Sequence, residues 1–193
     1  MIGKIFVLLV AGFLSMGIQL HAQIKFEREY KLKRSEVPQL ARSFVDSCDF
    51  SSKIKWYKEE SEAGISVEAK VREAGKFFSI EFGREGELQD VELDLPIREL
   101  DGSFRKNIDK ELSKRFRKFR IQRVQIQWTG SRESLLSLIK NGKSDLSFIR
   151  KYEIIVKGKK EKSQALYEIL FDEQAKIERI AEIKTRNTDN LDF

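Results

Sequence analysis

The pattern of apolar and polar residues changes its period near residue 53. Before that point apolar side chains recur every three or four positions, at Val37, Leu40, Ala41, Phe44, Val45 and Cys48. This spacing predicts an amphipathic helix from Ser35 to about Ser47. After residue 53 apolar and polar residues alternate, and turn residues separate predicted strands at 53–60, 64–74, 76–82 and 87–95. The first half of the chain therefore predicts one helix followed by a four-strand meander.

The second half of the chain repeats this order. It predicts a helix over 103–118 and strands near 121–129, 151–158, 164–172 and 176–184. In the last strand of the first half, Leu88 and Val91 lie three residues apart instead of two. Ile177 and Ile180 repeat that spacing in the second half. This shared change of phase predicts a β-bulge in the last strand of each half.

An additional short helix interrupts the second half. Residues 131–142 begin with Ser131 and end with Asn141 and Gly142, which are typical start and stop signals of a helix. The predicted fold class is α+β, with two tandem units, each a helix packed on a four-stranded antiparallel meander sheet. The first unit spans 23–96, and the second spans 97–193 with the inserted helix near 131–142. The sequence leaves open whether the two sheets join into one eight-stranded sheet.

The strand sequences resemble a known family. The segments that carry the resemblance are Ile54–Lys58, Lys76–Leu88 and Leu166–Ile177. They are similar to the PepSY-like, β-lactamase-inhibitor-like periplasmic proteins of Bacteroidetes-type bacteria, which carry tandem helix-plus-four-strand units after a signal peptide. The chain departs from this pattern at Ala175, where the first half has Gly86, and in the insertion. The resemblance implies an envelope location and a binding or inhibitory role, with no catalytic residues to carry over.

The first 22 residues have the pattern of a secretory signal peptide. Lys4 precedes an apolar stretch from Ile5 to Ile18, and Ala22 is a small residue at the predicted cleavage site. The apolar stretch is too short to cross a bilayer core of about 30 Å. We therefore expect a periplasmic or secreted protein, cut after Ala22, with no transmembrane segment after cleavage.

The composition argues against several kinds of catalytic centre. The one histidine is His21, inside the predicted signal peptide, so the mature chain would contain none. This excludes a Ser-His-Asp or Cys-His pair and any histidine-containing zinc site. The one cysteine, Cys48, lies in the apolar series of the first helix, which favours a buried structural thiol. We expect no enzyme activity, no metal and no cofactor.

Two surfaces are candidates for binding a partner. In the first sheet, the face opposite the apolar one carries Tyr57 and Phe77, which are candidate anchors for a partner protein. The alternative is that these aromatic side chains pack within the protein.

On the second helix the apolar residues lie on one side, and the residues on the opposite side are basic. These basic candidates are Lys106, Lys110, Lys114 and Arg117. A solvated helix surface is the alternative for them.

A third surface needs a cover. The outward face of the second sheet holds Ile155, Leu166 and Leu170, which is too apolar to remain in water. The inserted helix carries apolar residues that could cover it. These are Leu135, Leu136, Leu138 and Ile139. We expect them to pack on that face or on a partner protein.

The charge distribution narrows the class of partner. The formal net charge is +6, and the segment from Arg105 to Arg123 holds nine basic and two acidic residues. We predict a noncatalytic secreted or periplasmic binding protein, such as an inhibitor or sensor of a protein partner in the cell envelope. The partner is an envelope or secreted protein or an anionic envelope ligand, and the secretory signal disfavours nucleic acid. The alternative is a structural accessory protein of the envelope that self-associates.

Overall fold

In the described part of the chain, ten strands form one continuous sheet. The structure is a computed structural model that describes residues 23–25, 27–61, 64–161 and 163–184, so the predicted signal peptide and its cleavage site lie outside the described residues. The strand order is β1-β10-β9-β8-β7-β6-β5-β4-β3-β2. Neighbouring strands are antiparallel except β1 and β10, which are parallel.

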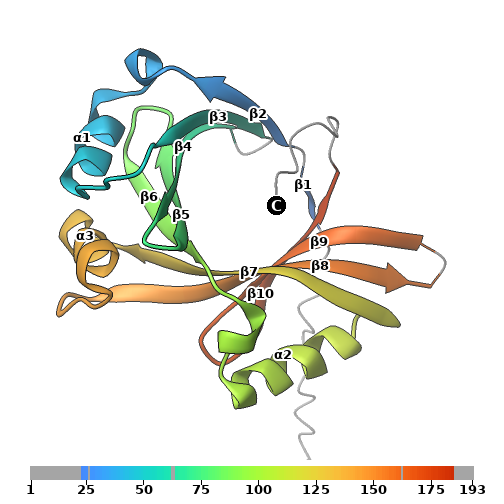
Figure 1. Cartoon of the computed structure of the whole chain (residues 1–193). Helices are drawn as coiled ribbons and strands as arrows, with labels where there is room; N and C mark the ends of the chain where they lie inside the picture. The colour runs from blue at the N-terminus through green and yellow to red at the C-terminus, as the bar shows by residue number, and fades with distance from the viewer. Residues whose placement is uncertain (1–22, 26, 62–63, 162, 185–193) are drawn as a thin grey trace, which may run out of the picture.

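The elements follow one another along the chain with short connections (Figure 1). The strands are β1 (Gln23–Lys25), β2 (Glu27–Leu32), β3 (Lys55–Ser61), β4 (Gly64–Glu73), β5 (Lys76–Gly83), β6 (Leu88–Asp94), β7 (Lys118–Gly130), β8 (Phe148–Lys160), β9 (Ser163–Phe171) and β10 (Ile177–Ile183). The helices are α1 (Gln39–Ser47), α2 (Gly102–Ser113) and α3 (Arg132–Asn141). Two 3₁₀ turns, η1 (Arg34–Glu36) and η2 (Ile97–Glu99), precede α1 and α2.

The sheet curves so strongly that its two edges meet. β1 pairs with β10 at one end of the strand order and β2 pairs with β3 at the other, yet a single residue separates β1 from β2. The three helices lie outside the curve (Figure 1). We call the side of the sheet that carries the helices the outer face and the side enclosed by the curve the inner face.

The apolar residues of the outer face form two clusters. In the first, α1 and α3 pack on strands β3 to β6 and on Trp128 of β7, and Phe44, Ile80 and Phe82 are fully buried. In the second, α2 packs on β7 to β10, and Ile108, Leu112 and Ile154 are fully buried there. Burial of these side chains, each contributing about 1.5–3 kcal/mol, stabilises the helices against the sheet.

The prediction of two tandem units with a four-stranded sheet each is wrong. β6 pairs with β7 from Val91 to Asp94, opposite Gln125 to Trp128, and this pairing fuses the strands into one sheet. Two further strands, β1 and β2, were not predicted. The sheet is therefore ten-stranded, with nine consecutive antiparallel strands from β2 to β10 in strand order, rather than two packed units.

Several local predictions are confirmed. The eight predicted strands and three predicted helices all exist, with ends that differ by a few residues. The register between β5 and β6 shifts between Glu81 and Phe82, and the register of β10 shifts between Ile177 and Arg179. These are the two β-bulges that the apolar spacing predicted. Cys48 is buried, and its Sγ donates to the carbonyl oxygen of Phe44.

The inserted helix α3 lies elsewhere than expected. Ser131 caps its first turn by accepting from the amide of Ser134, and Gly142 ends it in the left-handed conformation, as predicted. Its buried residues Leu135 and Leu138 pack with α1 in the first cluster, so they do not cover Ile155, Leu166 and Leu170. Strand alternation places those three residues on the inner face, and Ile155 and Leu170 are buried there. Among the described residues, no helix combines the length and the apolar character needed to cross a membrane.

Candidate functional site

The inner face is rich in carboxylates. Strand alternation places on it Glu29, Glu59, Glu68, Glu81, Asp90, Glu92, Glu153 and Glu168. Four of these side chains, Glu68, Glu92, Glu153 and Glu168, are buried. The residue pattern shows which side chains share a face, but not that curvature of the sheet encloses that face.

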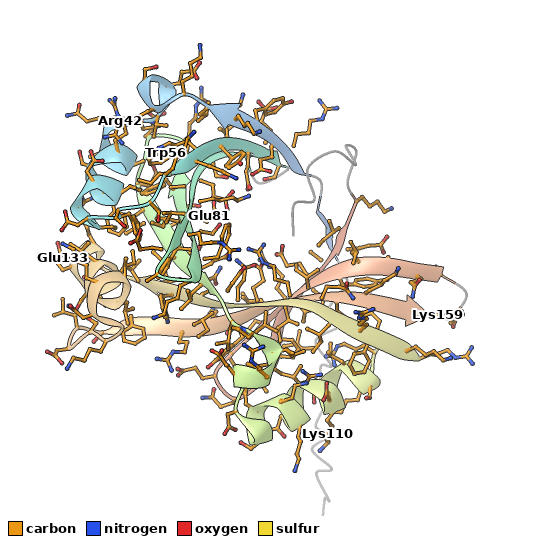
Figure 2. All side chains as sticks on the ribbon, in the orientation of Figure 1. Arg42, Trp56, Glu81, Lys110, Glu133 and Lys159 are labelled. Atoms are coloured by element: carbon orange, nitrogen blue, oxygen red, sulfur yellow. The ribbon has the colours of Figure 1, made fainter. Side chains whose placement is uncertain are left out.

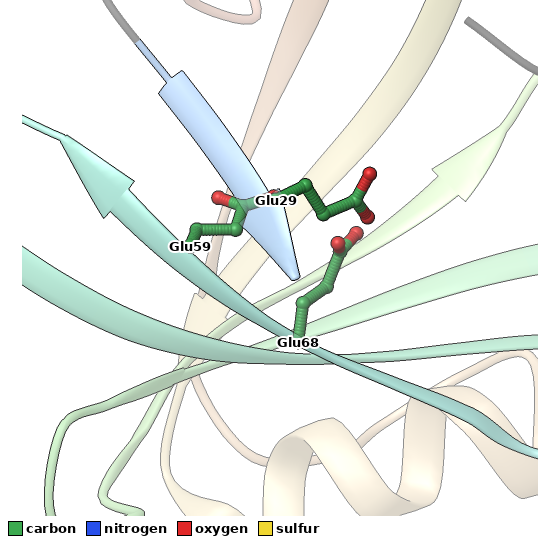
Figure 3. Close-up of side chains that lie close together, drawn as sticks. All are labelled: Glu29, Glu59 and Glu68. Carbon is green, nitrogen blue, oxygen red and sulfur yellow. The ribbon is translucent and has the colours of Figure 1, made fainter. Parts of the chain in front are cut away.

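Three of the carboxylates converge at the β2 side of this face. One carboxylate oxygen each of Glu29, Glu59 and Glu68 lies within 4.8 Å of the others (Figure 3). The ammonium group of Lys70 already lies among them, 2.6 Å from Glu29 Oε1 and 2.8 Å from Glu68 Oε2. Ser79 donates to the other oxygen of Glu68. Lys70 therefore provides the positive charge that this cluster needs, and the geometry does not call for a metal ion.

Glu81 occupies a different electrostatic environment. Its cross-strand neighbours are Glu68 on β4 and Asp90 on β6, so like charges face each other on both sides. Its side chain lies within the curve of the sheet (Figure 2). Burial raises the pKa of the Glu81 carboxyl well above its usual range, and the nearby carboxylates, led by Glu68, raise it further. The Glu81 carboxyl of the folded protein therefore keeps its proton to a higher pH than an exposed glutamate does.

We expect stability to fall as the pH rises, and Glu81→Gln to reduce this effect. Between the ordinary pKa of 4.5 and the raised pKa of Glu81, the folded protein binds more protons than the unfolded chain. The free energy of unfolding therefore decreases as the pH rises through this range. Glutamine keeps the shape without the charge, so the variant should be more stable than the wild type by about 1–3 kcal/mol near neutral pH.

Urea unfolding at about pH 5 and about pH 8 measures this difference. Glu85→Gln is the control, because the Glu85 side chain is 86% exposed in the turn after β5. Equal pH dependence of the wild type and the Glu81→Gln variant would show that Glu81 is ionised in the folded protein.

A pocket opens where β6 ends and the chain leaves the sheet. Its volume is about 370 Å³, and it lies beside the β4–β5 turn and the first half of β7. Its polar lining residues are Arg72, Asp94, Gln122 and Arg123. Its other lining residues are Gly75, Phe77, Leu95, Pro96, Ile97, Ile121 and Val124. Small-molecule sites are typically apolar cavities of this size with a few convergent polar groups.

A β-bulge shapes the wall of this pocket. The register between β7 and β8 shifts between Ile121 and Arg123, which leaves Gln122 as the extra residue. Bulges redirect neighbouring side chains and are frequent beside functional sites. Here Arg123 lies 2.9 Å from the Asp94 carboxylate and its guanidinium carbon is 5.7 Å from the centre of the Phe77 ring. Asp94 and Phe77 thus hold one arginine in place at the pocket.

The second arginine of the pocket is differently placed. Arg72 lies on β4 opposite Phe77 of β5, and its side chain is exposed. It forms no ion pair with any residue of the described ranges. Two guanidinium groups and one carboxylate give the pocket a net positive charge. Arginine binds carboxylates and phosphates through two parallel hydrogen bonds, so the pocket suits an anionic group with an apolar part beside it.

The two aromatic residues chosen from the sequence as binding candidates do not lie together in the structure. Phe77 lines the pocket, whereas Tyr57 lies farther along the inner face, with Lys70 Nζ 4.8 Å from its ring centre. Arg72 and Asp94 were not selected from the sequence. Arg123 was counted among the basic residues, but its pairing with Asp94 depends on the β6–β7 register.

Three of the four selected basic residues lie on the outer side of the sheet. Lys106, Lys110 and Lys114 are exposed on the surface of α2 and its cap that faces away from the sheet, as Lys110 illustrates in Figure 2. The predicted helix over 103–118 ends at Ser113, because Phe116 packs into the second cluster and the Arg117 amide donates to Lys159 of β8. Arg117 is exposed but is not part of the helix.

Some of the basic side chains on and just after α2 form ion pairs with acidic side chains of the helix. Lys114 and Arg115 both pair with Glu111, and Arg105 pairs with Asp109.

Comparisons with known proteins do not assign a family to the chain: no protein family model, no curated protein and no solved structure matches it.

Proposed function

We propose that this chain is a noncatalytic binding protein of the cell envelope and that the pocket between Arg72 and Arg123 takes an anionic group of its ligand. The observation that carries the proposal is the combination of two guanidinium groups with an apolar lining in one cavity of about 370 Å³. Asp94 offsets the charge of Arg123, and Arg72 is left to provide most of the attraction for the anion.

The envelope location rests on the sequence. The pattern of residues 1–22 predicts a secretory signal, and the resemblance to PepSY-like proteins implies the same location. Both stay predictions, as does the absence of catalysis. The lack of histidine after residue 21 supports a binding role, because no imidazole is present to act as a general base.

Replacing Arg72 with glutamine should weaken binding of small aromatic anions. Benzoate and phenyl phosphate are suitable probes, because each combines one anionic group with a ring that can contact Phe77 and Ile97. Loss of one bidentate contact should lower their affinity about five- to tenfold. Two-dimensional NMR titration measures the affinity and shows which backbone amides shift.

Arg98→Gln is the matched control, since Arg98 is exposed on η2 next to the pocket but does not line it. Amide shifts confined to α2, or equal weakening by both substitutions, would contradict the assignment of the pocket.

A further inference from the structure

Part of strand β7 has no neighbouring strand on one side, although β7 lies in the middle of the sheet. β7 has 13 residues and β6 has 7, and their pairing ends where Asp94 faces Gln125. The Leu95 amide then donates to the Val124 carbonyl, and Pro96 leads the chain away to η2 and α2. In the described part of the chain, the backbone of Lys118–Arg123 has no strand partner on that side. We call this backbone the open edge.

Every second residue of the open edge is exposed. Lys118, Arg120 and Gln122 are exposed, and the side-chain amide of Gln122 lies 3.5 Å from the carbonyl oxygen of Arg120. Six residues at about 3.3 Å each give an edge of about 20 Å. An open edge of this length is a template for another extended segment.

The charges beside the open edge are uncompensated. Lys118 faces Lys159 across the β7–β8 ladder, and Arg120 faces Lys157. All four side chains are exposed, and none of them forms an ion pair within the described ranges. Like charges directly opposite each other destabilise a sheet. An anion bound along this surface would remove that penalty.

These features distinguish between possible partners. A second copy of the open edge would bring the same positive charge, so the lysines and arginines repel self-pairing. A membrane or a nucleic acid would match the charge but could not pair with the backbone. An extended acidic peptide would match both. The pocket lies at the Arg123 end of the open edge, where it could receive one side chain of such a peptide.

We infer that the open edge binds an extended acidic segment of a partner protein, which adds a strand to β7 with one of its acidic side chains in the pocket. This inference rests on the proposed function and names the class of its ligand. Main-chain hydrogen bonds hold the added strand, as in other cases of strand addition. The cations of β7 and β8 select acidic side chains.

The test uses a synthetic peptide of about ten residues that alternates glutamate and threonine. We expect it to slow amide hydrogen exchange of 118–123 in the full protein. The double substitution Lys118→Glu and Arg120→Glu should lower its affinity about ten- to a hundredfold. The matched control is Lys106→Glu with Lys110→Glu, which changes the charge equally on the exposed surface of α2 and should leave the affinity unchanged.

A second peptide separates strand pairing from simple charge attraction. Methylation of alternate backbone nitrogens removes hydrogen-bond donors and keeps every carboxylate, so this peptide should bind at least about tenfold more weakly. Equal binding of the methylated peptide would overturn the inference. Equal protection of 118–123 by an oligonucleotide or by anionic lipid vesicles would also overturn it, as would loss of binding only in the α2 variant.

The outcomes also separate this inference from the pocket assignment. Binding of benzoate that depends on Arg72, without peptide protection of 118–123, would overturn strand addition and leave the proposed function in place. Peptide protection without any binding of benzoate or phenyl phosphate would support strand addition and reject the pocket as an independent anion site.

Discussion

Replacing Lys70 with methionine is expected to lower the free energy of unfolding by about 3–5 kcal/mol. Lys70 holds Glu29 and Glu68 at 2.6 and 2.8 Å, and the Glu68 side chain is only 5% exposed. Burial lowers the pKa of Lys70, but the ion pairs with Glu68 and Glu29 outweigh this effect and raise the pKa above its usual range. Without the ammonium group, Glu29 and Glu68 would lose the cation that lies between them. Urea unfolding near neutral pH measures the loss.

Two further variants test the cause of this loss. Adding Glu68→Gln to Lys70→Met removes the buried charge and should restore at least about 1 kcal/mol, since residues in one network couple energetically. Lys58→Met is the comparison for an exposed ion pair. The Lys58 to Glu60 distance is also 2.6 Å, but both side chains are more than a third exposed, so loss of this pair should cost much less than loss of Lys70. Equal losses for Lys70→Met and Lys58→Met would contradict the role assigned to burial.

The sequence predicts the local structure of this chain better than its architecture. Alternation and turn residues locate the strands β3 to β10, and the three-residue spacing of Leu88 and Val91 locates a bulge, because these features depend on neighbouring residues. The pairing of β6 with β7 joins segments separated by η2 and α2. Nothing in the local pattern specifies that pairing, so the continuous sheet could not be predicted from it.

The candidate site was missed for a related reason. The spacing of apolar residues in α3 predicts an apolar face, but it does not say that Leu135 and Leu138 pack beside α1. In the same way, the basic residues between Arg105 and Arg123 look continuous in the sequence. The structure divides them between the solvent face of α2 and the open edge of β7. The pocket depends on this division, since Arg123 contacts Asp94 of a different strand.

Replacing Gly86 with alanine is expected to lower the free energy of unfolding by about 2–4 kcal/mol. Gly86 lies in the turn between β5 and β6 with φ +91°, a conformation that side chains rarely adopt. A Cβ atom at this position would lie 2.8 Å from Pro38 Cβ and 2.9 Å from the backbone nitrogen of Ala41. Both atoms belong to the start of α1, so the helix would have to move away from the sheet.

The chain itself separates the two sources of this cost. The turn between β9 and β10 has the same hydrogen bonds, and Ala175 occupies the position of Gly86 there with φ 60°. An alanine is therefore compatible with this turn, and the contact with α1 is what requires glycine at residue 86. Gly75→Ala provides the measured comparison, because Gly75 has φ +80° and no atom within 4 Å of an added Cβ. That variant should lose only about 1 kcal/mol. Thermal and urea unfolding measure the loss of stability in both variants. Equal losses for Gly86→Ala and Gly75→Ala would mean that backbone strain alone accounts for the cost at residue 86, and that the docking of α1 does not require glycine there.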